Sequence, residues 1–323
     1  MPLSVAIPEL VGGLVYLALG GDFLVRGALA LARTTRISPM IVGLTVVALG
    51  TSAPELIVCL QAALTGYPEI AIANVVGSNI ANVLLVIALP ALIYPLAGNQ
   101  SSARSDALLM MFVSVGFVGL CLDGHIGRVD GLVLLGGLGV FAAIQLRAGR
   151  AAAEPPPRPG ALTIVPGLPS EGRWIALLLV AGAVCLPFGA NLLVHGAIGL
   201  ADRFNVPTEV VGLTVIATST SMPELVTTLI ATLRRAPDVA LGNVMGSNVL
   251  NILLIMGATA LVGREAIAVP PGFLAYDLPL MLVAALILTG VTLRRASVGR
   301  KLGIAMLLTY AAYAYLLYAG VAA

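Results

Sequence analysis

Two short stretches of the chain place a carboxylate, a proline and hydroxyl groups within long apolar runs: GTSAPE at 50–55 and STSMPE at 219–224. Side chains three and four residues apart share one face of a helix. That spacing holds for Thr51, Ser52 and Glu55 in the first stretch and for Thr220, Ser221 and Glu224 in the second. Carboxylate and hydroxyl oxygens are hard ligands that suit Na⁺ and Ca²⁺, whereas soft metals prefer Cys or His. The two stretches therefore predict oxygen ligands for a hard cation.

A second pair of motifs adds further oxygen atoms. The chain contains GSNIAN at 77–82 and GSNVLN at 246–251. Each motif has a hydroxyl and an amide four residues apart on one helix face, and these are Ser78 with Asn82 and Ser247 with Asn251. Taken alone, Ser and Asn beside a glycine more often hold membrane helices together. Their joint occurrence with two carboxylates favours a cation site.

The composition indicates what surrounds these polar residues. Of 323 residues, 59% are hydrophobic and 10% are charged, and the mean hydropathy is +1.05. Soluble domains carry about 25% charged residues, so we expect an all-α polytopic membrane protein. An ionised acid at the centre of a membrane helix costs on the order of 2.5–3.5 kcal/mol. No Lys or Arg lies at matching depth, so Glu55 and Glu224 need a cation between them.

Clusters of charged residues, Gly and Pro divide the chain into ten predicted membrane helices. Their ranges are 7–33, 38–64, 69–96, 105–122, 128–146, 173–201, 207–233, 238–263, 272–294 and 300–321. The longest connection, 147–172, contains EPPPRPG and indicates a Pro-rich linker. It separates two predicted units of five helices each, 1–146 and 173–323.

The distribution of Lys and Arg predicts the orientation in the membrane. Thirteen basic residues fall on the side of the linker, and three fall on the opposite side, namely Arg128, Arg203 and Arg264. We therefore expect the linker in the cytoplasm and both termini outside, in the cytoplasmic membrane of a prokaryote. Arg26 lies within the first predicted helix, where Asp22 four residues earlier is its expected ion-pair partner.

The two units are internal repeats. GLTVVALGTSAPEL at 43–56 matches GLTVIATSTSMPEL at 212–225 at ten of fourteen positions, with an offset of 169 residues. The same offset aligns the two GSN motifs without a gap. Because each unit has an odd number of helices, the second unit crosses the membrane in the opposite sense, and the repeats are inverted. Secondary transporters often have this design, with the substrate site at the repeat interface near the bilayer midplane.

The two prolines are expected to open the helices beside the acids. Pro54 has no N–H and its ring clashes with the carbonyl four residues earlier, which predicts a break near Gly50. Pro223 predicts the same near Ser219. The carbonyls close to each break are then free to face a hydrated cavity, where irregular backbone is tolerated at membrane depth. Each half of the chain is therefore expected to contribute half of one cation site.

Both repeats resemble the alpha-repeats of the cation/calcium exchanger superfamily, in particular the compact prokaryotic sodium/calcium exchangers. The paired TSxPE and GSN motifs carry the resemblance, which covers essentially the whole transmembrane chain. It implies an antiporter that exchanges Ca²⁺ for Na⁺ by alternating access. It also implies a ligand set: Glu55 and Glu224 at the centre, oxygens of Thr51, Ser52, Thr220, Ser221, Ser78 and Ser247, the carbonyls of Ala48 and Ala217, and Asn82 and Asn251 at the remaining polar positions.

The sequence departs from the pattern of that family at two positions. Ser219 replaces the glycine that matches Gly50, and it should tighten the packing there. Asn251 stands where some relatives, including potassium-dependent ones, carry Asp, and the missing charge argues against K⁺ co-transport. The linker is too short to hold the cytosolic Ca²⁺-sensing domains of the larger animal relatives.

Other functions stay open on the sequence alone. A proton-coupled calcium exchanger of the same superfamily usually carries Asn and Ala where Thr, Ser and Pro stand here. A membrane-embedded enzyme would use the two glutamates as an acid–base pair, but no nucleophile or metal-ligand cluster accompanies them, and we expect no enzymatic activity. A channel is the third alternative, because channels also contain inverted repeats. We expect no cofactor besides the transported ions, a lipid bilayer as the surroundings, and no nucleic-acid partner.

Overall fold

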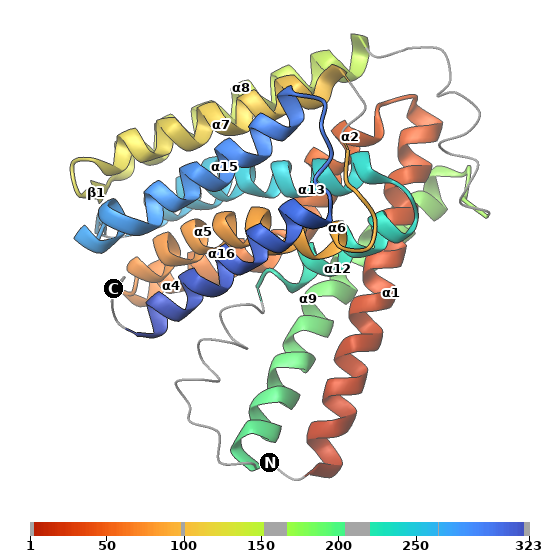
Figure 1. The fold of residues 1–323 in the computed structure, drawn as a ribbon, viewed down its shortest axis with the longest axis horizontal. Coiled ribbons are helices and arrows are strands. Elements are labelled where there is room, and N and C mark those ends of the chain that lie inside the picture. The colour runs from red at the N-terminus through yellow and green to blue at the C-terminus, as the bar shows by residue number, and fades with distance from the viewer. Residues whose placement is uncertain (1–2, 98–100, 152–166, 204–219, 264, 320–323) are drawn as a thin grey trace.

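The computed structural model describes residues 3–97, 101–151, 167–203, 220–263 and 265–319, and most of them are helical. The helices form a crossed bundle, and one long pair of helices lies at a steep angle to the others (Figure 1). Seven of the described helices are long and apolar enough to cross a membrane, or eight if the bent pair Pro39–Thr51 and Ala53–Thr65 is one span. The chain is therefore an all-α integral membrane protein.

The described residues form helical elements in both halves of the chain. In the first half they are α1 Leu3–Thr35, α2 Pro39–Val42, η1 Gly43–Val47, α3 Ala48–Thr51, α4 Ala53–Thr65, α5 Glu69–Ala81, η2 Asn82–Ile87, α6 Ala88–Ala91, α7 Ser101–Cys121 and α8 Arg128–Ala151. In the second half they are α9 Gly172–Arg203, α12 Met222–Leu233, α13 Pro237–Leu250, η4 Asn251–Met256, α14 Gly257–Val262, η5 Phe273–Asp277, α15 Leu278–Leu293 and α16 Arg300–Tyr318. Two short strands, β1 His125–Ile126 and β2 Ile267–Ala268, pair antiparallel between the two halves.

The predicted helix ranges differ from these elements in three respects. The predicted helix 38–64 is a series of short helices, and 69–96, 238–263 and 272–294 each contain a π-helical segment. Helix α8 continues to Ala151, beyond its predicted end at residue 146. Of the predicted helix 207–233, the structure describes α12, and the part before residue 220 lies outside the described residues.

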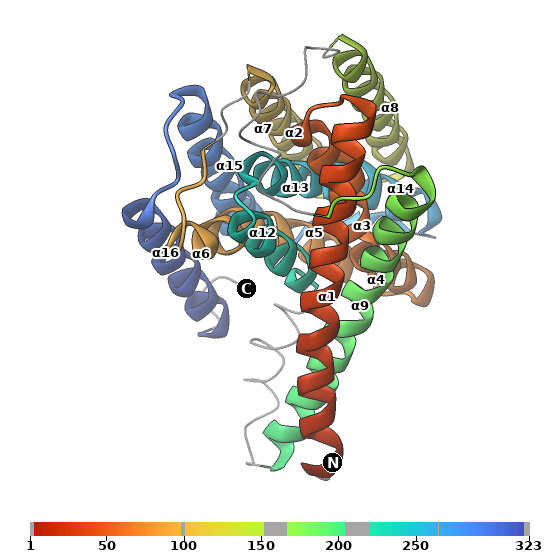
Figure 2. The same cartoon turned by 90° about the vertical axis from the view of Figure 1, so that its right-hand side faces the viewer.

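Helices α1 and α9 run antiparallel and pack along each other (Figures 1 and 2). Their contact contains glycines at seven-residue spacing, which are Gly13, Gly20 and Gly27 on α1 and Gly182, Gly189 and Gly196 on α9. A Cβ atom on Gly182 would lie 2.7 Å from Leu24 N, and one on Gly189 would lie 2.7 Å from Leu17 N. Such close backbone contact is typical of glycine-rich interfaces between membrane helices. Because the two sets of glycines differ by the repeat offset of 169 residues, the pair joins equivalent helices of the two halves.

The buried helix α13 crosses α2 and η1 at very short range. A Cβ atom on Gly242 would collide with the carbonyl oxygen of Met40, and one on Gly246 would collide with that of Leu44. Only a residue without a side chain allows the two backbones to come so near. This contact brings the second GSN motif against the helix that leads to the first TSAPE stretch.

Both GSN motifs end in a π-helical turn. Segment η2 begins at Asn82, and segment η4 begins at Asn251. A π-helical turn changes the direction in which the following side chains point, and such turns often occur at functional sites. The hydrophobic pattern of the sequence does not predict them, because it has the same period on both sides of the turn.

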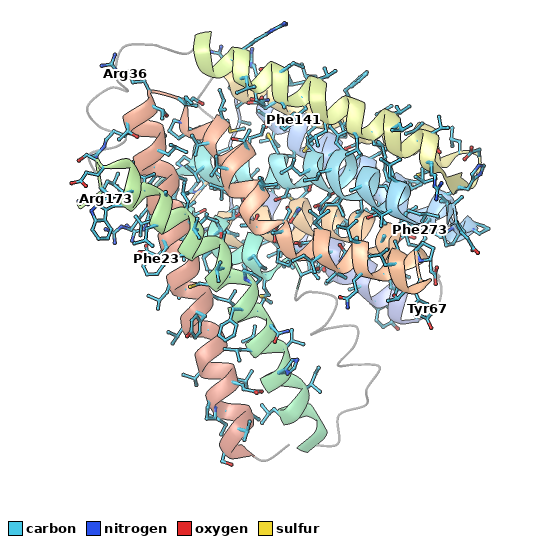
Figure 3. All side chains as sticks on the ribbon, turned by 180° about the vertical axis from the view of Figure 1, so that it is seen from behind. Phe23, Arg36, Tyr67, Phe141, Arg173 and Phe273 are labelled. Atoms are coloured by element: carbon cyan, nitrogen blue, oxygen red, sulfur yellow. The ribbon has the colours of Figure 1, made fainter. Side chains whose placement is uncertain are left out.

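The outer surface of the bundle is apolar, as a lipid-facing surface must be. Phe112 on α7 is 76% exposed and Leu308 on α16 is 66% exposed. In the view from behind, Phe141 lies on α8 where that helix covers the bundle, and Tyr67 lies at the turn between α4 and α5 (Figure 3). Phe141 is buried, whereas Tyr67 is exposed.

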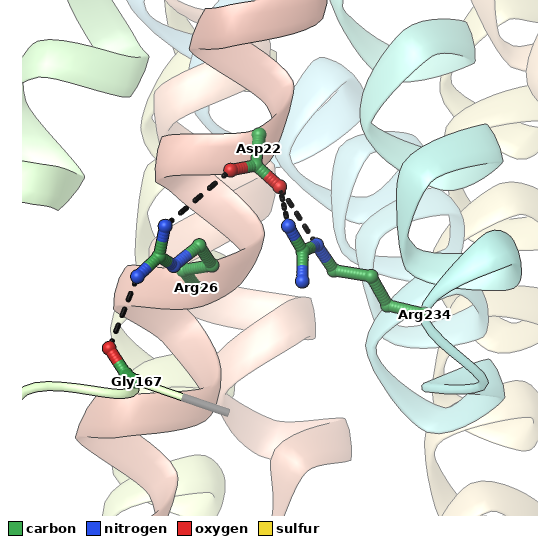
Figure 4. Close-up of polar contacts among 4 residues, drawn as sticks. All are labelled: Asp22, Arg26, Gly167 and Arg234. Carbon is green, nitrogen blue, oxygen red and sulfur yellow. Dashed lines mark hydrogen bonds and ion pairs between the residues drawn. The ribbon is translucent and has the colours of Figure 1, made fainter. Parts of the chain in front are cut away.

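A half-buried ion-pair cluster connects α1 to α12 (Figure 4). The expected pair is present, with Arg26 Nη1 3.8 Å from Asp22 Oδ2. Arg234 at the end of α12 binds the other carboxylate oxygen, with its Nε 2.7 Å from Asp22 Oδ1. Arg26 also donates to the carbonyl oxygen of Gly167 at 3.0 Å. Asp22 therefore connects α1 to α12, and Arg26 connects α1 to the segment that precedes α9.

The α1–α9 interface yields a prediction about stability. In Gly189→Ala, the new methyl group meets the backbone of α1, so we expect a loss of about 1–3 kcal/mol in the free energy of unfolding. Gly139→Ala on α8 is the matched control, because a Cβ atom there meets no described atom within 4 Å. Unfolding of the purified variants in detergent measures the difference. Equal midpoints for the two variants would contradict the close packing.

Candidate cation site

The two proline-containing stretches share one backbone geometry. Helix α3 ends at Thr51 and α4 begins at Ala53 after a bend of 46°. Ser52 lies at the bend with φ −86° and ψ 5°. In the second half, α12 begins directly after Ser221, which has φ −84° and ψ 2°. The break predicted near Gly50 lies at Ser52. The position of the break predicted near Ser219 falls outside the described residues.

Each of the two new helices has a glutamate in its first turn. Glu55 and Glu224 are each 1% exposed, and Ser52, three residues before Glu55, has its Oγ 3.2 Å from Glu224 Oε1. A helix N-terminus favours a nearby negative charge by about 0.3–1 kcal/mol. Burial of an ion costs several kcal/mol even after the protein relaxes. The helix ends are therefore too weak to keep both acids ionised without a further positive charge nearby.

Hydroxyl groups from both halves meet at the second of these acids. Ser52 Oγ lies 3.2 Å from Glu224 Oε1 and 3.1 Å from Ser247 Oγ. Ser247 Oγ lies 3.4 Å from the same carboxylate oxygen. Thr51 Oγ1 is 3.5 Å from Ser247 Oγ and donates to Asn243 Oδ1 at 3.1 Å. The first TSAPE stretch and the second GSN motif are thus parts of one hydrogen-bonded cluster.

Four asparagines form two equivalent hydrogen bonds where α5 and α13 cross. Asn82 Nδ2 donates to Asn248 Oδ1 at 3.0 Å, and Asn251 Nδ2 donates to Asn79 Oδ1 at 3.0 Å. All four side chains are buried. The two bonds are related by the repeat offset, and each of them joins one half of the chain to the other.

Four acceptor oxygens around this cluster are buried and have no hydrogen-bond partner within the described ranges. They are Glu55 Oε2, Glu224 Oε2, Asn82 Oδ1 and Asn251 Oδ1. Buried polar atoms in native proteins nearly always have a partner. A set that contains only acceptors needs a hydrogen-bond donor or a cation. One carboxylate and one amide oxygen come from each half, and oxygen donors of these kinds suit Na⁺ and Ca²⁺.

Several other predicted ligands lie close to this set along the chain. Ser78 is buried one helical turn before Asn82, and Ser221 is buried directly before α12. Thr220 is half-buried in the turn at the start of α12. Ala217 lies outside the described residues.

The carbonyl of Ala48 differs from the expectation of a free ligand. It accepts a hydrogen bond from Ser52 N at 2.9 Å, and Thr51 Oγ1, which has one proton and donates it to Asn243, lies 3.3 Å away. The carbonyl that loses its usual helical partner to the missing N–H of Pro54 is that of Gly50, four residues earlier. A carbonyl oxygen has two lone pairs, so the Ala48 carbonyl can accept the bond from Ser52 and still face a cation.

Sequence reasoning missed the buried asparagines that surround the predicted ligands. Asn79 and Asn248 contact the predicted ligands directly. Asn243 accepts from Thr51 and donates to Thr228 Oγ1 at 3.1 Å. The internal repeat could have identified these residues, because an asparagine occupies each position and also the equivalent position, 169 residues away, in the other half.

Comparisons with known proteins agree over most of the chain. The family model described as sodium/calcium exchanger protein matches residues 6–147 and 174–319. The chain is 38% identical to a candidate antiporter, CaxA of Alkalimonas amylolytica, over 95% of this chain and 96% of the relative. It is 32% identical to inner membrane protein YrbG of Escherichia coli, over 94% and 93% of the two chains.

A solved structure shares the fold. The sodium/calcium exchanger from Methanococcus jannaschii superposes with a TM-score of 0.82 at 27% sequence identity. The superposition covers 96% of this chain and 97% of that one. The likeness therefore extends over both halves and is not confined to the helices that carry the motifs.

The arrangement of the acids predicts how Ca²⁺ changes stability. A ligand that binds only the folded state at about 100 times its Kd stabilises that state by about 2.7 kcal/mol. We expect Ca²⁺ to raise the unfolding temperature of the wild-type chain and to have little effect on Glu55→Gln or Glu224→Gln. Without Ca²⁺, both variants should be at least as stable as the wild type, because the repulsion is gone.

Asp106→Asn is the matched control for these variants. Asp106 is also a buried acid, but it lies on α7 and accepts from Gln145 Nε2 at 3.1 Å, outside the cluster. This variant should keep the full Ca²⁺ effect. A normal Ca²⁺ effect in either glutamate variant would contradict the site.

Proposed function

Because the chain belongs to the sodium/calcium exchanger protein family, we propose that it is a secondary antiporter that exchanges Ca²⁺ for Na⁺ across a membrane. The observation that supports this most directly is the set of four unpartnered oxygens on Glu55, Glu224, Asn82 and Asn251. The Methanococcus jannaschii relative, which shares the fold, is named a sodium/calcium exchanger. The predicted ligands provide the further oxygens that either ion needs.

Two carboxylates explain why the two ions would exclude each other. One Ca²⁺ or two Na⁺ balance the charge of Glu55 and Glu224. Both ions prefer hard oxygen donors, so they compete for the same ligands. A bound Ca²⁺ must therefore leave before Na⁺ takes over the carboxylates, and this competition is the basis of counter-transport. Any Na⁺ beyond two per Ca²⁺ would move net charge across the membrane.

The architecture we propose is ten membrane helices in two inverted repeats, 1–146 and 173–323, joined by the cytoplasmic linker 147–172 with both termini outside. The matched geometry of Ser52 and Ser221 supports it, as do the matched π-helical turns and the equivalent glycines of α1 and α9. Transporters of this design expose a central site alternately to the two sides of the membrane. We place the chain in the inner membrane of a prokaryote, in line with the name of the YrbG relative.

Proton coupling is the closest alternative to Na⁺ coupling. The hydroxyl groups at the cluster favour Na⁺, because a proton bound to a carboxylate needs no further oxygen ligands. A channel would carry Ca²⁺ without a counter-ion. Our proposal includes neither an enzymatic activity nor a cofactor.

Transport in proteoliposomes tests the coupling ion. We expect uptake of radioactive Ca²⁺ to follow an imposed Na⁺ gradient, to saturate with Ca²⁺, and to be indifferent to K⁺, because Asn251 adds no third negative charge. A pH gradient of equal size should drive little uptake. Vesicles that contain the Glu224→Gln variant are the control for leakage. Uptake driven by the pH gradient alone would identify a proton-coupled exchanger, and uptake without any counter-ion would identify a channel.

The proposed orientation leads to a labelling experiment. In a variant without native cysteines, a cysteine in place of Arg158 in the linker should react only with reagents that reach the cytoplasm. A cysteine in place of Glu265, which lies on the side with few basic residues, should react from outside intact cells. The reverse pattern would show that the chain has the opposite orientation.

A further inference from the structure

An asparagine that binds a cation must present its oxygen and keep its nitrogen away. The two ends of the amide are nearly equal in size, but the nitrogen carries two hydrogens that a cation repels. Asn82 and Asn251 are each 1% exposed, so bulk water does not select the end that faces the ion. A buried partner has to determine it.

Asn248 and Asn79 are the buried partners of these two amides. Asn248 Oδ1 accepts from the nitrogen of Asn82, and Asn79 Oδ1 accepts from the nitrogen of Asn251. Because each bond holds the nitrogen end, the oxygen end of each ligand is the one without a partner. The two unpartnered amide oxygens are therefore a consequence of these two bonds.

The orienting asparagines are in turn held by backbone atoms. Asn79 Nδ2 lies 3.2 Å from the carbonyl oxygen of Asn248, and Asn248 Nδ2 lies 3.4 Å from the carbonyl oxygen of Asn79. Methionine sulfurs lie beside the same nitrogens, Met281 Sδ at 3.9 Å from Asn79 and Met110 Sδ at 3.8 Å from Asn248. A carbonyl oxygen accepts hydrogen bonds and cannot donate them. The nitrogen end of each orienting amide is thus fixed, and its oxygen end faces the ligand.

We propose that Asn79 and Asn248 are positioning residues that set the cation affinity by fixing which end of Asn251 and Asn82 faces the ion. The inference rests on the proposed function, since it takes Ca²⁺ as the ion at the site. Loss of a partner that orients a metal ligand typically weakens metal binding 10- to 100-fold. Each bond crosses between the halves, so the amide ligand of one repeat depends on the other repeat for its orientation.

A double-mutant cycle at positions 79 and 251 tests the proposal, with the Kd for Ca²⁺ measured on the purified full-length chain. We expect Asn79→Ala to raise the Kd about 10- to 100-fold, because the freed amide of Asn251 can turn its nitrogen toward the ion. In Asn251→Asp, both ends of the side chain are oxygens, so orientation no longer matters. In that background, Asn79→Ala should raise the Kd by no more than about twofold.

The comparison of the two backgrounds separates orientation from packing. If Asn79 only filled space, its removal would weaken Ca²⁺ binding equally in both, and that result would overturn the proposal. An unchanged Kd in Asn79→Ala would overturn it as well. Gln145→Ala is the matched control: it removes a buried amide from α8, one that donates to Asp106 Oδ1 at 3.1 Å outside the site. It should leave the Kd within about twofold.

The second half of the chain offers the equivalent cycle. If Asn79→Ala does not fold, Asn248→Ala with Asn82→Asp gives the same comparison, with the same expected and contradicting results. A wild-type chain that binds no Ca²⁺ would overturn the proposed function, and the inference with it. Ca²⁺ binding by the wild type with equal losses in both backgrounds would overturn the inference alone.

Discussion

Two like-charged carboxylates buried near each other are the constraint on which the rest of the structure depends. In the described part of the chain, no Lys or Arg forms an ion pair with Glu55 or Glu224. Burial of an ion costs several kcal/mol, and the whole stability of a typical domain is about 5–15 kcal/mol. A fixed basic residue would neutralise the acids permanently and leave nothing for a cation to do. Neutral oxygens around the acids stabilise a bound cation and still allow it to leave.

The irregular backbone follows from the same constraint. A continuous α-helix satisfies its own N–H and carbonyl groups and offers a buried acid only its side face. New helices begin directly after Ser52 and Ser221, so that each glutamate lies in a first turn, where the partial positive charge of the helix end favours it. The π-helical turns begin at Asn82 and Asn251, the residues whose oxygens lack partners. These four departures from regular helix coincide with the predicted ligands, whereas the π-helical segments η1 and η5 contain none of them.

Local chemistry explains which features the sequence predicts. The break after Thr51 follows from the covalent structure of Pro54, and the helical class follows from the long apolar runs. The asparagine pairs and the ion pair of Asp22 with Arg234 join residues more than 160 positions apart. They depend on where α5 crosses α13 and where α1 meets α12, and no periodicity within one helix contains that information. The repeat gave a partial substitute, because asparagines shared by both halves marked positions whose contacts appear only in three dimensions.

The symmetry of the sequence does not extend to the packing of α1 and α9 on the rest of the chain. Gly21 of α1 lies against Val226 and Ile230 of α12, where an added Cβ atom would come within 3.2 Å of Val226 Cγ1. The repeat-equivalent of Val226 is Ile57 on α4, and it is 63% exposed. The ion pair of Asp22 with Arg234 also joins α1 to α12. The equivalent positions hold Asn191 and Thr65, which cannot form an ion pair. The two halves have nearly identical motifs, but α1 packs on α12 through contacts that the equivalent helices α9 and α4 do not repeat. These contacts stabilise α1 on α12 in this structure.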